Sequence, residues 1–226
     1  MPAEVAAVIK EAERQGWAYA GGRSLSVPVD DFDLAELPAT DLGNAERFAR
    51  RFKDRFLYSS ALGWFAWDGA RWCRDDAEND VSLCVHRTVR LIQEEAKALR
   101  ESDEDHVVDK KRDGREIRRS DRHAGWGRAS ETSAKLAAIP KHAAPYLAVG
   151  TNELDADPLK FNVANGTIII RRGGEEEEGD PISFQPHDQA DRITKRAPVV
   201  YDPKANCPVY DQFLSQVQPD PRMRAF

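Results

Sequence analysis

The sequence contains little of what defines secreted, membrane-spanning or nucleotide-hydrolysing proteins. It has only three cysteines, Cys73, Cys84 and Cys207, and an odd number this small cannot build a disulfide framework but suits a reducing compartment. The longest apolar stretch, about 61–67, is far shorter than a membrane span. The phosphate-binding pattern GxxxxGK[ST] and the dinucleotide pattern GxGxxG are both absent. These absences exclude three classes of protein for this segment: a fold stabilised by a disulfide framework, a membrane-spanning protein, and an ATPase that acts by itself.

The charge balance is acidic. The 226 residues include 33 Lys and Arg against 39 Asp and Glu, which gives a net charge of −6. The isoelectric point is near 5.5 and the mean hydropathy is −0.64. Such a chain does not bind polyanions over its whole surface, although a local basic patch is still allowed. With 41% hydrophobic residues, it has enough apolar material for one large domain or two small ones.

Three segments are expected along the chain. Apolar spacing predicts a helix over 3–15 with a stop at Gly16, so 1–20 is an N-terminal helix. Periodicity is lost between 21 and 43, where prolines and acidic residues indicate an acidic linker. The remainder, 44–226, is then the main domain. We expect it to end where a helicase ATPase domain would begin.

Helical periodicity returns four times in the main domain. Helices are predicted over 44–56, 80–100 and 130–139, with Pro140 and Pro145 bracketing a short turn, and a final helix begins at Cys207-Pro208. The long helix places one stripe inward, formed by Val81, Val85, Thr88, Ile92, Ala96 and Leu99. The last helix is expected to turn Val209, Phe213, Leu214 and Val217 inward. Between the long helix and the helix at 130–139, residues 101–125 show no apolar stripe.

Two short antiparallel β-hairpins are predicted, at about 63–73 and 159–172. Asp68-Gly69 and Asn165-Gly166 are favoured two-residue turns, which would pair Trp67 with Ala70 and Ala164 with Thr167. One face of the second hairpin would pack inward, with Phe161, Val163, Ile168 and Ile170. The other face would be exposed to water, with Lys160, Asn162, Thr167 and Arg171. After it comes a solvated acidic loop with Glu175–Glu178. The predicted fold class is therefore α+β, mostly helical with two hairpins.

One basic stretch stands out in this acidic chain. Within 109–122, seven cations face four acidic residues, which gives a local charge of +3; the cations are Lys110, Lys111, Arg112, Arg115, Arg118, Arg119 and Arg122. Without an apolar stripe, such a segment is typical of a flexible arm that contacts phosphates, or of a charged, solvated linker. A second, weaker candidate for DNA binding is a set of helix arginines, Arg47, Arg50, Arg51 and Arg55, which can equally form a polar helix face.

No catalytic or metal-binding residues are predicted. The spacing of Cys73, Cys84 and His86, with Cys207 as a remote fourth ligand, matches no common zinc pattern. Acidic groups at 75–80 and 103–109 could serve a metal-dependent nuclease or primase, but solvated surface explains them more simply. The five histidines are scattered along the chain.

Four segments, in this order, carry a family resemblance. They are TDLGNAERFARRF at 40–52, GWFAWDGARW at 63–72, LKFNVANGTIII at 159–170 and ITKRAPVVYDPKANCPVYDQFL at 193–214. Over about 40–226 the chain resembles the N-terminal domain, named for the poxvirus nucleoside triphosphatase, of phage and plasmid DNA primase-helicases. In that family the module precedes a superfamily 3 helicase domain, and a primase domain often precedes the module.

The resemblance implies a non-catalytic accessory domain in mobile-element DNA replication. The domain would couple engagement of single-stranded or forked DNA to an adjoining ATP-driven, hexameric helicase motor. The parent protein is expected to be similar to an ATP-dependent helicase or primase. ATP and Mg²⁺ are expected only in its helicase motor. The implied location is the cytoplasm of a bacterial or phage-infected cell, without membrane contact. The alternative is a protein-interaction or oligomerisation scaffold that does not touch DNA.

Overall fold

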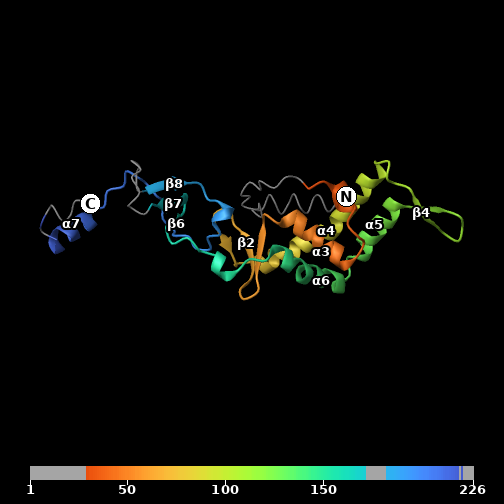
Figure 1. Cartoon of the computed structure of the whole chain (residues 1–226), viewed down its shortest axis with the longest axis horizontal. Coiled ribbons are helices and arrows are strands. Elements are labelled where there is room, and N and C mark those ends of the chain that lie inside the picture. Colours follow the sequence, from red (N-terminus) through yellow and green to blue (C-terminus); the bar gives the residue numbers. More distant parts are fainter. Residues whose placement is uncertain (1–28, 172–181, 219, 221–226) are drawn as a thin grey trace, which may run out of the picture.

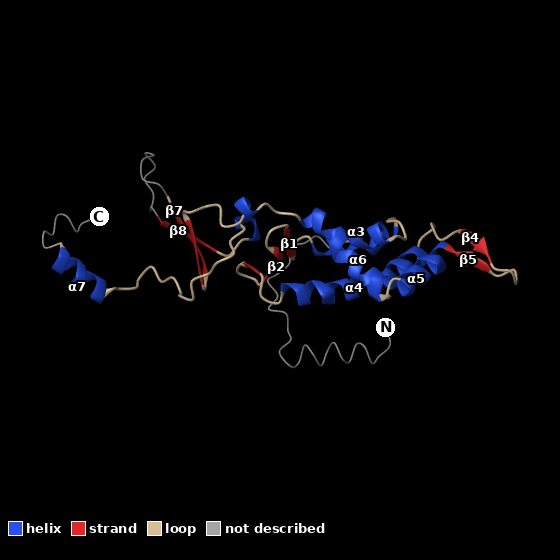
Figure 2. Cartoon of the chain, turned by 90° about the horizontal axis from the view of Figure 1, so that it is seen from below, coloured by secondary structure: helices blue, strands red, loops and turns tan. Residues whose placement is uncertain are grey.

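The computed structural model describes residues 29–171, 182–218 and 220. The predicted N-terminal helix and the Glu175–Glu178 loop lie outside these residues. Helices form the middle of the molecule, a β-hairpin projects at one end, and a small sheet and a last helix lie at the other (Figure 1). The turned view shows the same order of parts (Figure 2). The fold is α+β and mostly helical, as predicted.

The helices are α2 (Asp31–Ala35), α3 (Asp41–Phe52), α4 (Ala77–Arg100), α5 (Arg119–Ala129), α6 (Ser133–Ala143) and α7 (Pro208–Val217). Short 3₁₀ turns occur at Ala144–Leu147, Thr151–Glu153 and Gln189–Asp191. The first sheet consists of β1 (Phe56–Ser59), β2 (Gly63–Trp67) and β3 (Trp72–Cys73). A two-stranded sheet follows, with β4 (Val107–Lys110) and β5 (Glu116–Arg118). The third sheet contains β6 (Lys160–Val163), β7 (Gly166–Ile170) and β8 (Ile182–Gln185).

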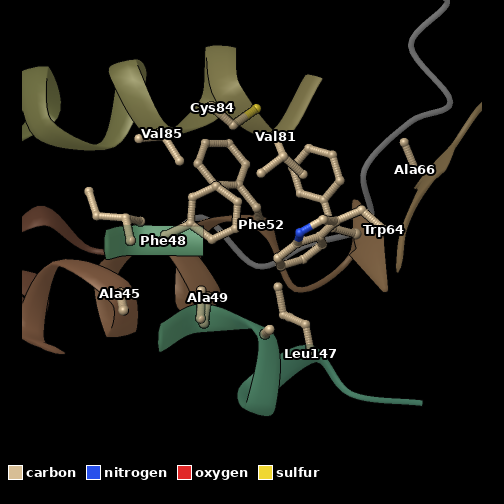
Figure 3. Packing of buried hydrophobic residues seen from close by; sticks show 14 of the residues in the cluster. Ala45, Phe48, Ala49, Phe52, Trp64, Ala66, Val81, Cys84, Val85 and Leu147 are labelled. Atoms are coloured by element: carbon tan, nitrogen blue, oxygen red, sulfur yellow. The ribbon is translucent and has the colours of Figure 1, made fainter. Parts of the chain in front are cut away.

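The apolar core lies between α3, α4, α6 and the first sheet, and aromatic rings dominate it (Figure 3). Phe48 stacks on Phe56 at 5.8 Å between ring centroids, and Trp64 meets both rings edge-on at 6.2 Å. Helix α4 closes the core with its predicted stripe, every member of which is buried. Such offset and edge-to-face pairs add about 0.5–1.5 kcal/mol each beyond the burial of their area.

Helix α2 was not predicted. It lies in the segment that the sequence indicates to be an acidic linker, yet Leu34 and Ala35 are buried and α2 packs against α4. Helix α3 then begins three residues before the predicted start, because Thr40 Oγ1 accepts a hydrogen bond from Gly43 N. At Gly43 the Pro38 carbonyl approaches so closely that a Cβ would lie 2.0 Å from its oxygen. This close approach brings the α2 segment onto α3.

Several predicted element ends need correction. Helix α3 ends at Phe52 and not at 56, and Phe56 begins strand β1, which the sequence did not predict. Helix α4 begins at Ala77 and ends at the predicted Arg100. Helix α6 runs through Pro140 before the Ala144–Leu147 turn begins. The stripe-free segment 101–125 also has regular structure, in β4, β5 and the first half of α5.

Both predicted hairpins exist, but their registers differ from the prediction by two residues. Trp67 pairs with Trp72, and Thr167 pairs with Asn162. In the first hairpin Asp68 Oδ1 accepts from Ala70 N and Arg71 N, which favours a wider turn. A shift of two leaves every side chain on its predicted face. Trp67 and Trp72 therefore still meet, with ring centroids 5.5 Å apart.

Burial in the second hairpin differs from the prediction at four positions, Phe161, Asn162, Thr167 and Ile170. Asn162 and Thr167, expected to be wet, are 4% and 1% exposed, whereas Phe161 is 53% exposed. Asn162 Nδ2 donates to the Ala70 carbonyl, and the backbone carbonyl of Asn162 accepts from Ala197 N. Asn162 is buried where its amide nitrogen and its own backbone meet the backbone of neighbouring segments. Val163 alone of the predicted inward residues is fully buried.

Several hydrogen bonds to the backbone join the third sheet and its flanking segment to the rest of the fold. Trp72 N donates to the Ile193 carbonyl at 2.8 Å, and Trp72 Nε1 donates to the Gln189 carbonyl at 3.0 Å. Gln189 Nε2 donates to the Asp54 carbonyl at 2.9 Å. Together with the bond from Asn162 to Ala70, these contacts hold the C-terminal part of the chain against the first sheet.

Helix α7 begins at Pro208 as predicted, but its apolar side does not face inward. Val209, Phe213 and Val217 are exposed, and none of the residues of α7 is buried among the described parts of the chain. The apolar spacing correctly predicts an amphipathic helix, but it cannot tell whether the helix packs on its own chain.

A buried charge cluster joins four helical segments. Arg47 Nε donates to Glu95 Oε2 at 2.8 Å, and both side chains are fully buried. The remaining guanidinium nitrogens of Arg47 donate to the carbonyls of Leu34, Leu37 and Pro38. Arg51 NH2 contacts Glu95 Oε1 at 3.0 Å, and His123 Nε2 lies 2.9 Å from Glu95 Oε2. A carboxylate can only accept, so Nε2 of His123 carries the proton.

Replacement of Arg47 is expected to destabilise the fold strongly. Arg47→Ala leaves the Glu95 carboxylate buried with one partner fewer and removes the donor from three carbonyls. We expect a loss of about 3–5 kcal/mol in the free energy of unfolding, measured by urea denaturation. Arg50→Ala is the matched control, because Arg50 is the exposed arginine on the same helix. Equal losses for the two variants would contradict a structural role of the buried pair.

The same cluster makes stability depend on pH. Burial raises the pKa of Glu95, but the hydrogen bond with His123 and the guanidinium groups of Arg47 and Arg51 outweigh burial and lower it below 4.5. A lowered folded-state pKa adds stability that is present above the unfolded-state pKa and is lost as pH falls through the folded-state value. The stability gap between the native chain and Glu95→Gln is therefore expected to narrow below pH 4.5 in urea titrations. Glu94→Gln, on the exposed side of α4, should give no such gap.

Candidate nucleic-acid interface

The predicted basic arm is an ordered β-hairpin. Lys110 pairs with Glu116 and Val107 with Arg118, and the turn between the strands is closed by Lys111 N donating to the Arg115 carbonyl at 2.8 Å. Gly114 has φ +84°, a backbone conformation that suits glycine in a tight turn. The sequence hides this hairpin because apolar residues are few and the strands alternate among charged side chains. The hairpin projects from the end of the helical body (Figures 1 and 2).

The base of the hairpin is fixed by a buried carboxylate. Asp105 accepts from Ser120 N at 2.8 Å and from Ser120 Oγ at 3.0 Å, so it caps the first turn of α5. Arg118 NH1 donates to the Asp105 carbonyl, and Arg119 NH2 donates to Glu36 Oε1 at 2.6 Å. Arg118 and Arg119, two of the predicted DNA-binding residues, therefore hold the hairpin against α5 and the α2 segment.

The cations at the tip divide into paired and unpaired groups. Lys110 contacts Glu116 at 3.3 Å, and Arg115 contacts Asp113 at 2.6 Å, both as exposed ion pairs. Such pairs are weak and exchange readily with other partners. Lys111 and Arg112 are exposed and have no ion pair within the described parts of the chain. Arg122 on α5 is likewise exposed without one.

The four arginines predicted as a second DNA-binding set do not share an exposed face: three lie on α3, and Arg55 follows its end. Arg47 is fully buried and Arg51 nearly so, both within the charge cluster. Arg55 contacts Asp80 at 3.0 Å and lies over the Phe56 ring. Arg50 alone of the four is exposed. The structure thus brings together the hairpin cations but assigns Arg47 and Arg51 to the interior.

Sequence reasoning missed the outer face of α4. Arg87, Arg90 and Lys97 are exposed there and form no ion pair with the residues that the structure describes. The sequence could have indicated this basic face, because these three residues lie on the opposite side of the helix from the predicted apolar stripe. Glu94 interrupts the row, which leaves three cations against one carboxylate on this face.

The acidic groups and cysteines singled out in the sequence lie on different elements of the described residues. No group of three or more His, Cys, Asp or Glu side chains there could hold a metal ion. Asp80 pairs with Arg55, and Asp105 caps α5. Burial raises the pKa of the Cys73 thiol, the opposite of what a metal-binding or nucleophilic thiolate requires.

Comparison with known families identifies the chain. A family model described as "D5 N terminal like" matches residues 45–219 of the 226. The chain belongs to this family, which forms the N-terminal part of primase-helicase proteins. A search among curated proteins gave no match. Among the described helices, none combines the length and apolar character needed to cross a membrane.

Asp105 is expected to control the order of the hairpin. Asp105→Ala leaves Ser120 N and Oγ without their buried acceptor, which costs about 1–3 kcal/mol. We expect that loss in urea unfolding, together with faster amide hydrogen exchange over 107–118. Asp103→Ala, an exposed neighbour in the same turn, is the control and should change neither quantity. Unchanged exchange in Asp105→Ala would show that the cap does not position the hairpin.

Proposed function

We propose that this chain is a non-catalytic accessory domain of a phage- or plasmid-type DNA replication primase-helicase. Its role is to couple DNA engagement to an adjoining, ATP-driven superfamily 3 helicase motor. Membership of the D5 N-terminal-like family supports the association with primase-helicases. On this proposal ATP and Mg²⁺ act in the motor. Any primase activity of the parent protein belongs to a separate domain. The protein works in the cytoplasm of a bacterial or phage-infected cell.

One observation carries the DNA contact: the projecting β4–β5 hairpin with Lys111 and Arg112 at its tip. These two cations are exposed and unpaired among the described residues, in a chain with a net charge of −6. A chain with an overall negative charge repels DNA, so a cationic hairpin that extends beyond the helical body is favoured as the point of contact. Point charges on flexible side chains bind phosphates and carry no sequence readout. The proposed contact is therefore nonspecific.

A second candidate function is a protein-interaction scaffold without DNA contact. The observation in its favour is the exposed apolar surface of the third sheet and α7, at the other end of the molecule from the hairpin. The two functions use different surfaces, so separate variants can test them.

The double variant Lys111→Glu/Arg112→Glu is expected to weaken DNA binding and its salt dependence. Each phosphate contact on a single strand contributes about −0.7 to the slope of log K against log salt. Loss of two contacts should therefore make the slope about 1.4 less negative. The measurement is fluorescence anisotropy with single-stranded and forked DNA over a salt series.

A control with the same change of charge is Lys141→Glu/Lys204→Glu. Both lysines are exposed and lie outside the hairpin, so this variant lowers the overall charge equally but should keep most of the slope. If the two double variants lose the same amount, overall charge and not the hairpin explains binding. If the native chain does not bind DNA even at low salt, the DNA-contact function is wrong and the scaffold function is favoured.

A further inference from the structure

One face of the third sheet carries several exposed apolar side chains, although Val163 on the same face is buried. The pairing of Phe161 with Ile168, and of Ile168 with Phe184, places these side chains on one face, where Ile170 and Ile182 also lie. Phe161 is 53% exposed, and Ile170 and Phe184 are each 43% exposed. A contiguous apolar face of this kind on a small sheet marks an interaction site.

Helix α7 carries a matching uncovered face. Val209, Phe213 and Val217 recur at intervals of four residues, so they lie along one side of the helix. They are between 54% and 77% exposed. Asp211 is the one charged residue of the helix, so packing this side against an apolar surface removes few charges from water.

We propose that α7 of one copy packs onto the apolar face of the third sheet of a second copy. This rests on the scaffold function proposed above, for which it names the partner, and it does not depend on the DNA contact. Each copy offers one donor helix and one acceptor face, so two copies can exchange helices reciprocally, or several can close a ring.

The segment that precedes α7 already touches this sheet face. The Tyr201 ring lies on Phe184, with centroids 5.1 Å apart. Asn165 holds Tyr201 in place, because its side chain accepts from Tyr201 N at 2.9 Å and donates to the Tyr201 carbonyl at 3.0 Å. An α7 docked on this face would continue a contact that the chain itself begins.

The path of the chain after Tyr201 favours a second copy as the partner that covers this sheet face. Asn165 fixes Tyr201 at the turn end of the β6–β7 hairpin, whereas Ile170 and Ile182 pair at the opposite end of their strands. From Tyr201 the chain leads away from the sheet, and α7 lies apart from it in both views (Figures 1 and 2). An extended connection that leads to a helix without buried residues allows that helix to pack on a second copy.

Light scattering of the full chain over a range of concentrations tests this proposal. The native chain is expected to associate to at least twice the 25.4 kDa mass of one copy. Phe213→Asp removes the donor and Phe161→Asp removes the acceptor, and each is expected to raise the dissociation constant more than tenfold. Leu83→Asp, at an equally exposed apolar site on α4, should leave association unchanged.

Mixing the two variants decides whether the contact runs between copies. Phe161→Asp still has an intact α7 and Phe213→Asp an intact sheet face, so an equimolar mixture should regain a 1:1 complex through one contact. A misfolded variant could not restore binding in this way, and Val217→Asp and Ile170→Asp provide a second donor and acceptor pair. A native chain that stays monomeric, or a mixture that fails to associate, overturns the proposal. The hairpin variant Lys111→Glu/Arg112→Glu should associate normally, which separates this outcome from failure of the DNA contact.

Discussion

The buried pair of Arg47 and Glu95 is the constraint on which the helical body depends. A planar guanidinium group donates hydrogen bonds in only a few directions. That of Arg47 donates to one carboxylate and three backbone carbonyls. Glu95 in turn receives Arg51 and His123, so α2, α3, α4 and α5 share one polar centre. An apolar core tolerates sliding of helices, whereas these directional bonds fix their angles. Because α5 carries the β4–β5 hairpin at its start, the direction of the hairpin depends on the same pair.

Sequence periodicity was informative where one element is long and buried on one side. Helix α4 illustrates this, since its stripe and its C-terminal end agree with the prediction. Turn signals were less reliable: Asp68-Gly69 and Asn165-Gly166 each predicted a register two residues away from the observed one. The burial of the second hairpin could not be predicted locally. Asn162 is buried because the Ala70 carbonyl, 92 residues away in sequence, receives its amide.

The candidate interface shows the same limit for charged residues. The basic stretch was visible from composition, but its hairpin was not, since charged side chains occupy most strand positions. Arg47 and Arg50 are equivalent in the sequence as cations of one helix, yet one is fully buried and the other exposed. Their difference comes from Glu95, which only the folded chain brings opposite Arg47. A single sequence therefore locates basic segments better than it separates structural cations from available ones.

The junction between the third sheet and the body has a mechanical consequence. Trp72, Gln189 and Asn162 hold it through hydrogen bonds to backbone carbonyls. Hydrogen bonds lose strength steeply with distance and misalignment, whereas apolar contacts can slide before they separate. Under tension along the long axis of the molecule, such a junction behaves as a brittle coupling. It transmits small displacements rigidly between the third sheet and the helical body, and beyond a threshold it releases as a unit.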